Sequence, residues 1–245
     1  MIVNCDAKGL EVNVAAYLSQ DPILRKEVAE GFDMHESNRV ILGLPSRLIA
    51  KIFVFRLIYG GSAYAYSVDS DFAECFYSIK KWQDIIDKFY DKYRGLAQWH
   101  NEILRTAIQT GCLKMPTGRE YNFTAGRDYK GEIKWPRPTI LNYPVQGLGA
   151  DIMAIARVDF AARFSKAKST GLTGSIINTV HDSIEVDVET IEDVRRTSKI
   201  FFEVFQDIPK SFESVFGIKY NLPMFCEVSY GPNRKDLKEI LLTDC

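Results

Sequence analysis

The stretch Ser175-Ile-Ile-Asn-Thr-Val-His-Asp-Ser-Ile-Glu-Val-Asp-Val188 decides how the chain folds. Residues that favour β structure lead into its centre, and Ile184, Val186 and Val188 then alternate with polar residues. This alternation predicts two strands, the second of them half-buried. His181-Asp182-Ser183 lies at the junction, where a hairpin has to reverse its direction.

Asp182 has two interpretations at this junction. A carboxylate on a hairpin tip is held by two strands and is open to solvent, which suits metal binding. Asp is also frequent in turns for conformational reasons alone. The hairpin by itself leaves both interpretations open.

The composition is that of an ordinary globular protein. The 245 residues, 46% hydrophobic and 26% charged, can form one large or two small domains. No apolar run approaches the ~20 residues that a membrane-spanning helix needs, and the first residues have no signal-peptide pattern. The five cysteines are scattered without a Cys-x-x-Cys pair, which favours free thiols and no zinc site. We therefore expect a cytoplasmic protein without a membrane partner, in the host cytoplasm if it is viral.

The net charge of -1 argues mildly against a nucleic-acid-binding protein, which is expected to carry a basic surface. The net charge does not show how the charges are distributed, however, because acidic groups gathered at a metal site would offset basic surfaces elsewhere.

Asp6 lies where a short apolar run ends and a pattern with helical spacing soon begins. It is either a functional carboxylate or a cap near the N-terminus of that helix. His35 lies in a polar segment that opens another helix, and taken alone it is more often structural.

A predicted helix from Arg47 to about Tyr59 carries a stripe of four related positions. Arg47, Lys51, Phe55 and Tyr59 are each four residues apart, so they lie along one side of the helix. Cations bind phosphate oxygens and an aromatic ring stacks on a base, which is a way to hold a nucleoside triphosphate. The alternative is a solvated cationic face with two aromatic residues in the core.

The remaining pattern predicts helices over residues 70–110, short strands with turns over residues 111–136, and a polar helix over about residues 190–204. Pro136, Pro138 and Pro144 predict an extended connector, followed by a helix from about Val145 to Phe164.

Three separated segments resemble the motifs of family A DNA polymerases. Asp6-Ala-Lys-Gly-Leu-Glu11 resembles motif A, most closely that of the phage replicative type; the helix from Arg47 to Gly60 resembles motif B; and Val180-His-Asp182 resembles motif C. Asp33-x-His35, Asn142-Tyr-Pro-Val-Gln146-Gly-x-Gly-Ala-Asp151 and Glu227-Val-Ser-Tyr-Gly also resemble family segments, in the family's order. The resemblance runs over residues 3–239.

The resemblance implies an α+β fold, with an antiparallel palm sheet, packed helices and a mainly helical fingers subdomain. Residues 1–32 and 137–245 would form the palm, and residues 33–136 the fingers. The implied reaction is template-directed transfer of a nucleotide from a dNTP to a primer 3′-hydroxyl on primer–template DNA, with two Mg²⁺ ions.

The resemblance also implies roles for individual residues. Asp6, Asp182 and the carbonyl of Ala7 would hold the metal ions. Arg47, Lys51 and His35 would contact the triphosphate, and Lys51 would also be a proton donor to pyrophosphate. The other implied roles are stacking on the nucleotide by Phe55, a steric gate against ribose at Glu11, the templating pocket at Tyr59, and primer–template contacts by Arg137, Asn142, Gln146 and His181.

The sequence departs from the family pattern at several positions. Ser183 stands where many members have Glu, Asn13 replaces the usual Arg of motif A, and Arg56 replaces a common Gly. Arg56 would place a long cation beside the stacking ring, and Arg137 is one position off its usual spacing to Asn142.

Motif A comes almost at the start of the sequence, so we expect the thumb and the exonuclease to be absent and a second polypeptide to carry them. A sheet beginning at Asp6 would also expose an edge. The open alternatives are a fragment of a phage-type single-subunit RNA polymerase and a non-catalytic DNA-binding or assembly subunit.

Overall fold

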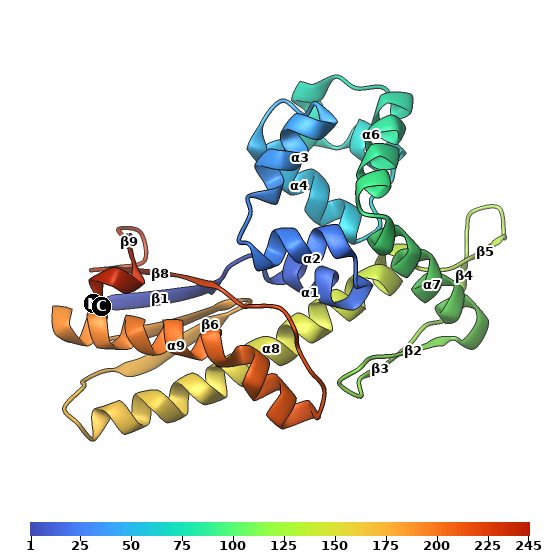
Figure 1. The fold of residues 1–245 in the computed structure, drawn as a ribbon. Coiled ribbons are helices and arrows are strands. Elements are labelled where there is room, and N and C mark those ends of the chain that lie inside the picture. The colour runs from blue at the N-terminus through green and yellow to red at the C-terminus, as the bar shows by residue number, and fades with distance from the viewer. The chain divides into compact units, whose positions relative to one another are not determined.

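The computed structural model describes residues 1–245, and they form two compact units (Figure 1). The first unit consists of Met1–Leu10 and Leu148–Cys245, and the second is the continuous segment Glu11–Gly147. These units are defined by contacts alone, so the palm and fingers boundaries expected from the sequence stay a prediction. None of the helices combines the length and the apolar character needed to cross a membrane.

The first unit is built on a five-stranded sheet with the strand order β6-β7-β1-β8-β9, and each neighbouring pair is antiparallel. The strands are β1 (Ile2–Ala7), β6 (Ser175–Val180), β7 (Ser183–Asp187), β8 (Cys226–Gly231) and β9 (Lys238–Ile240). The predicted hairpin is therefore present as β6 and β7. The predicted α+β class with an antiparallel sheet and packed helices is confirmed.

Strand β1 is in the middle of the sheet. It pairs with β7 on one side and with β8 on the other, so the edges are β6 and β9. Partners from late in the sequence therefore flank this early strand. Val3 and Cys5 of β1 are fully buried, whereas Asn4 and Asp6 point to the opposite, more open face.

Two long helices belong to this unit. The C-terminal part of α8 (Arg137–Lys168) lies in it, and α9 (Ile191–Phe216) contacts β1 and β8. The rings of Phe160 and Phe201 stack at 3.9 Å between centroids, and Arg163 donates to Asp207 at 2.9 Å. The two helices are thus joined by a buried stack and by an ion pair; a short 3₁₀ turn, η2 (Leu242–Asp244), ends the chain.

Helix α8 is longer than the sequence predicted, because residues 137–144 are helical rather than an extended connector. Pro144 lies inside the helix and cannot donate a backbone hydrogen bond there. Ile140, Leu141 and Val145 are nevertheless fully buried. Their burial offsets the lost hydrogen bond, so the proline was a misleading signal. Helix α9 likewise continues beyond the predicted end through Pro209.

The second unit is mainly helical, with two small hairpins. Its elements are α1 (Leu10–Ser19), which starts at the unit boundary, α2 (Pro22–Ala29), α3 (Met34–Leu42), α4 (Arg47–Ile58), α5 (Ala63–Val68), η1 (Ser70–Cys75), α6 (Ile79–Lys92), α7 (Arg94–Thr110), the pair β2 (Cys112–Lys114) with β3 (Glu120–Asn122), and the pair β4 (Gly126–Arg127) with β5 (Ile133–Lys134).

An aromatic cluster fixes α4 in this unit. The ring of Phe53 is fully buried and lies 5.0 Å from Tyr66, 6.0 Å from Trp82 and 5.9 Å from Phe89, between centroids. Ser46 caps the helix by accepting a hydrogen bond from the backbone N–H of Ile49 at 3.2 Å. Because one side of α4 is anchored by this cluster, the side with Lys51 is left open to solvent.

Candidate functional site

The tip of the β6–β7 hairpin consists of His181 and Asp182. The Ser183 hydroxyl donates to the carbonyl of Val180 at 3.0 Å across the tip. His181 has a φ of 50°, in the left-handed region that two-residue hairpin turns require and that glycine usually supplies. A non-glycine residue there costs on the order of 1–3 kcal/mol, and such strain is concentrated at functional sites.

The end of β1 is tied to this tip. Asp6 is paired with Ser183 in the β1–β7 ladder, and the backbone N–H of Ala7 donates to the carbonyl of Asp182 at 3.0 Å. Asp6 and Asp182 are far apart in the sequence, yet they lie at the same end of the sheet. Both side chains are half-buried, so they remain within reach of a ligand.

The donors at this end of the sheet suit a hard cation. No group of three or more His, Cys, Asp and Glu side chains is arranged to hold a metal ion. Mg²⁺ is commonly bound by only one or two carboxylates, and water and substrate phosphates complete its coordination. Asp6, Asp182 and a backbone carbonyl such as that of Ala7 therefore fit Mg²⁺ bound together with a nucleotide.

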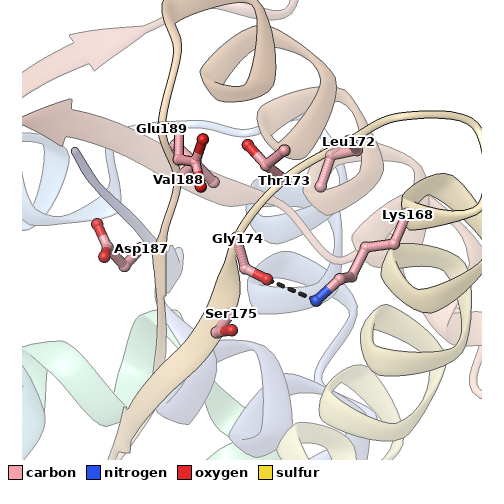
Figure 2. A pocket seen from close by; sticks show the side chains of 8 residues that line it. All are labelled: Lys168, Leu172, Thr173, Gly174, Ser175, Asp187, Val188 and Glu189. Carbon is pink, nitrogen blue, oxygen red and sulfur yellow. Dashed lines mark hydrogen bonds between the residues drawn. The ribbon is translucent and has the colours of Figure 1, made fainter.

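A hollow of about 450 Å³ lies at the other end of the hairpin (Figure 2). Ser175 and Asp187, at the base of the hairpin, line it, and Lys168 crosses it to donate to the carbonyl of Gly174 at 2.8 Å. The base is remote along both strands from the tip that carries Asp182. This hollow is therefore distinct from the carboxylate site.

The predicted stripe on α4 lies within the second unit. Arg47 donates to Asp33 at 2.7 Å, whereas Lys51 makes no ion pair and has its ammonium 5.7 Å from the centre of the Phe55 ring. Asp33 also caps α3, because it accepts from the backbone N–H of Glu36 at 3.1 Å. Lys51 is thus an exposed cation without a carboxylate partner on this side of the helix.

Asp33 was not among the sequence candidates. The Arg47 guanidinium lowers the pKa of this carboxyl through their hydrogen bond. The sequence does contain a capping signal, an Asp followed three residues later by Glu, but nothing in it indicates the link to Arg47.

His35 lies beside the stripe. Its ring is 5.6 Å from that of Phe55, and its Nδ1 atom is buried without a hydrogen-bond partner. Burial first, and then the Arg47 charge, lower the pKa of His35 to about 4. A neutral imidazole with an unused nitrogen is suited to contact an anion that arrives from outside the chain.

His35 and His100 are expected to make the second unit sensitive to mild acid. Burial lowers the pKa of each imidazole from 6.5 to about 4. Between these values the unfolded chain binds protons that the folded chain does not, so the free energy of unfolding falls as the pH is lowered through this window. Above pH 6.5 these two histidines should not change the free energy of unfolding. Below about pH 4 they should cause no further decrease.

Urea unfolding as a function of pH tests this prediction. For fully buried His100 the pKa shift corresponds to roughly 3 kcal/mol. A His100→Gln variant should therefore lose much of the pH dependence in this window. An unchanged slope in that variant would contradict the assignment.

The second unit contains three further residues with predicted roles in the site: Glu11, Tyr59 and Gln146. The Gln146 side-chain amide donates to the Tyr59 hydroxyl across a sequence separation of 87 residues. Burial, followed by the nearby Glu11 charge, raises the pKa of Tyr59. The structure thus brings together the end of α4, the start of α1 and α8.

The residues predicted to contact the primer–template lie on different elements. Arg137 is exposed at the first residue of α8, and its charge contributes to the lowered pKa of His100. Asn142 and Gln146 are four residues apart on α8 and share a side of that helix. His181 is in the first unit, on the hairpin tip.

Arg56 does not extend beside the ring of Phe55, where the resemblance to the family placed it. Its guanidinium donates to Asp69 and, at 2.5 Å, to Asp71, and it lies over the Phe72 ring at 5.2 Å. The prediction was wrong because two acidic residues at the start of η1 bind this side chain. Arg56 therefore joins α4 to η1 and leaves the side with Lys51 and Phe55 open.

Comparisons with known proteins agree over nearly the whole chain. The sequence model of the family described as DNA polymerase family A matches residues 1–236. DNA polymerase I of Aquifex aeolicus (strain VF5) is 26% identical over 236 residues, which are 88% of this chain and 38% of that protein. DNA polymerase I of Deinococcus radiodurans is 26% identical over 251 residues, covering 97% of this chain and 24% of that protein.

A solved structure has the same fold. The POL domain of Pol1 from M. smegmatis, in complex with DNA primer-template and dNTP, matches with a TM-score of 0.73 at 21% identity, covering 94% of this chain and 39% of that chain. The chain thus spans well under half the length of each of these relatives.

Proposed function

The chain belongs to DNA polymerase family A, and from this premise we propose that it performs template-directed DNA synthesis. The reaction is transfer of a nucleotide from a dNTP to the 3′-hydroxyl of a primer. The observation that carries the proposal is the backbone bond between Ala7 and Asp182, which ties the strand with one predicted metal-binding carboxylate to the tip with the other.

Two Mg²⁺ ions would be held by the carboxylates of Asp6 and Asp182 and by the carbonyl of Ala7. When bound, Mg²⁺ would activate the primer hydroxyl and neutralise charge on the triphosphate. The protein's contribution is to place the two carboxylates on a rigid sheet, where they need little reorganisation. With Ser183 in place of a third motif carboxylate, substrate phosphates and water would supply the remaining ligands.

The open side of α4 would bind the nucleotide. Lys51 would attract the triphosphate, and Arg47 would exchange Asp33 for phosphate oxygens. His35 would offer its unpaired nitrogen to the phosphates, and Phe55 would stack on the nucleotide. Lys51 would also donate a proton to the departing pyrophosphate. Tyr59, positioned by Gln146, would border the templating base, and Arg137, Asn142 and His181 would contact the primer–template.

Glu11 would exclude ribonucleotides by occupying the space that a 2′-hydroxyl needs. A Glu11→Ala variant is expected to incorporate ribonucleotides at least about tenfold more readily relative to deoxynucleotides, because a hydroxyl-sized rejection is worth roughly 1–3 kcal/mol. Single-nucleotide extension with competing rNTP and dNTP measures this ratio. Glu30→Ala, at an exposed position directly after α2, is the matched control. An unchanged ratio in Glu11→Ala would remove Glu11 from this role.

The motif Asp6-Ala-Lys-Gly-Leu-Glu11 also suggests the phage replicative type within the family. We propose in addition that a second polypeptide carries the thumb and the 3′–5′ exonuclease. Two observations favour this proposal: the net charge is -1, and the edge strand β6 exposes Ile176, Ile177 and Val180. Co-purification from the native source tests it.

Primer extension tests the proposed function as a whole. A labelled primer annealed to a template is incubated with dNTPs and Mg²⁺, with the chain in its native assembly. Extension that follows the template sequence and stops without Mg²⁺ is the expected result. Binding of DNA without any extension would instead identify a non-catalytic subunit.

A further inference from the structure

Lys8 lies directly beyond the strand that carries Asp6. Its backbone N–H donates to the carbonyl of Phe225 at 2.9 Å, so the main chain at Lys8 is held against the start of β8. Gly9 follows with a φ of 61°, which turns the chain toward α1. The backbone at Lys8 is therefore held by this hydrogen bond and by the one from the preceding Ala7 N–H to the carbonyl of Asp182.

The ammonium of Lys8 is paired with Glu227, which is the neighbour of Asp6 across the sheet. Lys8 Nζ and Glu227 Oε1 are 3.2 Å apart. Glu227 is the direct partner of Asp6 in the β1–β8 ladder, and opposed residues in such a ladder project from the same face. The row Ser183, Asp6 and Glu227 therefore crosses three strands on one face, and Lys8 reaches back to its end.

Structural stability does not account for this ion pair. The side chains of Lys8 and Glu227 are 58% and 57% exposed. Ion pairs this exposed contribute little to folding and exchange their partners easily. A polyphosphate carries more negative charge than one carboxylate, so it would compete well for the ammonium.

We propose that Lys8 is a binding residue for the triphosphate of the incoming nucleotide. In the absence of nucleotide, Glu227 holds the ammonium on the face of the sheet that carries Asp6; when the nucleotide arrives, the ammonium transfers from Glu227 to a phosphate oxygen. This inference rests on the proposed polymerase function.

Two measurements on the active polymerase test this role, and both use Lys8→Ala. Steady-state incorporation should show a KM for dNTP raised about fivefold with a smaller change in kcat, as expected for the loss of one exposed phosphate contact. Equilibrium binding of dNTP to the primer–template complex, with Ca²⁺ replacing Mg²⁺ so that no chemistry occurs, should weaken by a similar factor. Lys8→Arg should restore both values.

Lys210→Ala is the matched control. Lys210 also forms an ion pair with a carboxylate, that of Asp207, at 3.0 Å. It lies on helix α9 and not directly beyond the strand that carries Asp6. This variant should leave KM and dNTP binding unchanged. Equal effects of Lys8→Ala and Lys210→Ala would show a general charge effect and overturn the proposal.

Glu227→Gln separates Lys8 from its partner. Because it releases the ammonium, this variant should bind dNTP as tightly as the unchanged protein, or up to about threefold more tightly, with the same Mg²⁺ requirement. A lower kcat together with a raised Mg²⁺ requirement would make Glu227 the group that the site uses and overturn the assignment of Lys8.

An unchanged KM in Lys8→Ala, in a polymerase that Asp182→Asn inactivates, would reject the Lys8 inference alone. A lack of activity in the unsubstituted protein would reject the proposed function.

Discussion

An Asp182→Asn variant is expected to incorporate nucleotides at least about 10³-fold more slowly than the unchanged protein, because a neutral amide binds Mg²⁺ poorly. Asp6→Asn should have an effect of similar size. Both side chains are half-buried at the end of a sheet whose other face is packed, so neither substitution opens a cavity. The variants should therefore fold normally.

Single-turnover primer extension measures the rate, and urea unfolding reports the fold. Glu189→Gln is the matched control, because Glu189 is an exposed carboxylate just beyond β7 that borders the hollow at the hairpin base. It should retain full activity. A rate in Asp182→Asn within tenfold of the original would contradict the metal site at the hairpin tip.

The second large effect is expected for Lys51→Ala. The three cations of α4 differ in their partners: Arg47 binds Asp33, Arg56 binds Asp69 and Asp71, and Lys51 makes no ion pair. The charge of Lys51 is thus not compensated within the protein. Removing a cation that stabilises charge in the transition state lowers the rate by about 10²–10³-fold.

Pre-steady-state extension at increasing dNTP concentration separates the loss of binding from the loss of rate. Lys51→Arg should restore much of the binding but less of the rate, because a guanidinium does not release its proton readily. Lys80→Ala, an exposed lysine of α6, is the control and should behave as the unchanged protein. Equal activities of Lys51→Ala and Lys80→Ala would rule out a role for Lys51 in catalysis.

Local patterns in the sequence predicted the β6–β7 hairpin and α4 well. The alternation after Ser183 and the Ser46 cap each depend on neighbouring residues, so they are visible in a short window. Pairing of Asp6 with Ser183 and Glu227 depends on residues distant in the sequence, so no periodicity indicates it. The resemblance between motifs, rather than the pattern, placed Asp6 and Asp182 together.

The wrong predictions share a physical cause. Pro144 has an unfavourable local preference, but burial of Ile140 and Leu141 keeps α8 continuous around it. The resemblance to the family placed Arg56 beside the stacking ring, but Asp69 and Asp71 determine where its guanidinium lies. In each case contacts formed only in the folded chain overrode a local preference.

The central place of β1 has a consequence for the order of folding. The second unit is one continuous segment, Glu11–Gly147, so a growing chain can complete it early. Strand β1 precedes that segment, but both of its partners follow it, so the sheet must close a loop that contains the whole second unit. Such closure is slow because contacts distant in sequence form late. A ribosome-bound chain that ends before Cys226 should therefore hold a protease-resistant second unit while β1 is still cleavable.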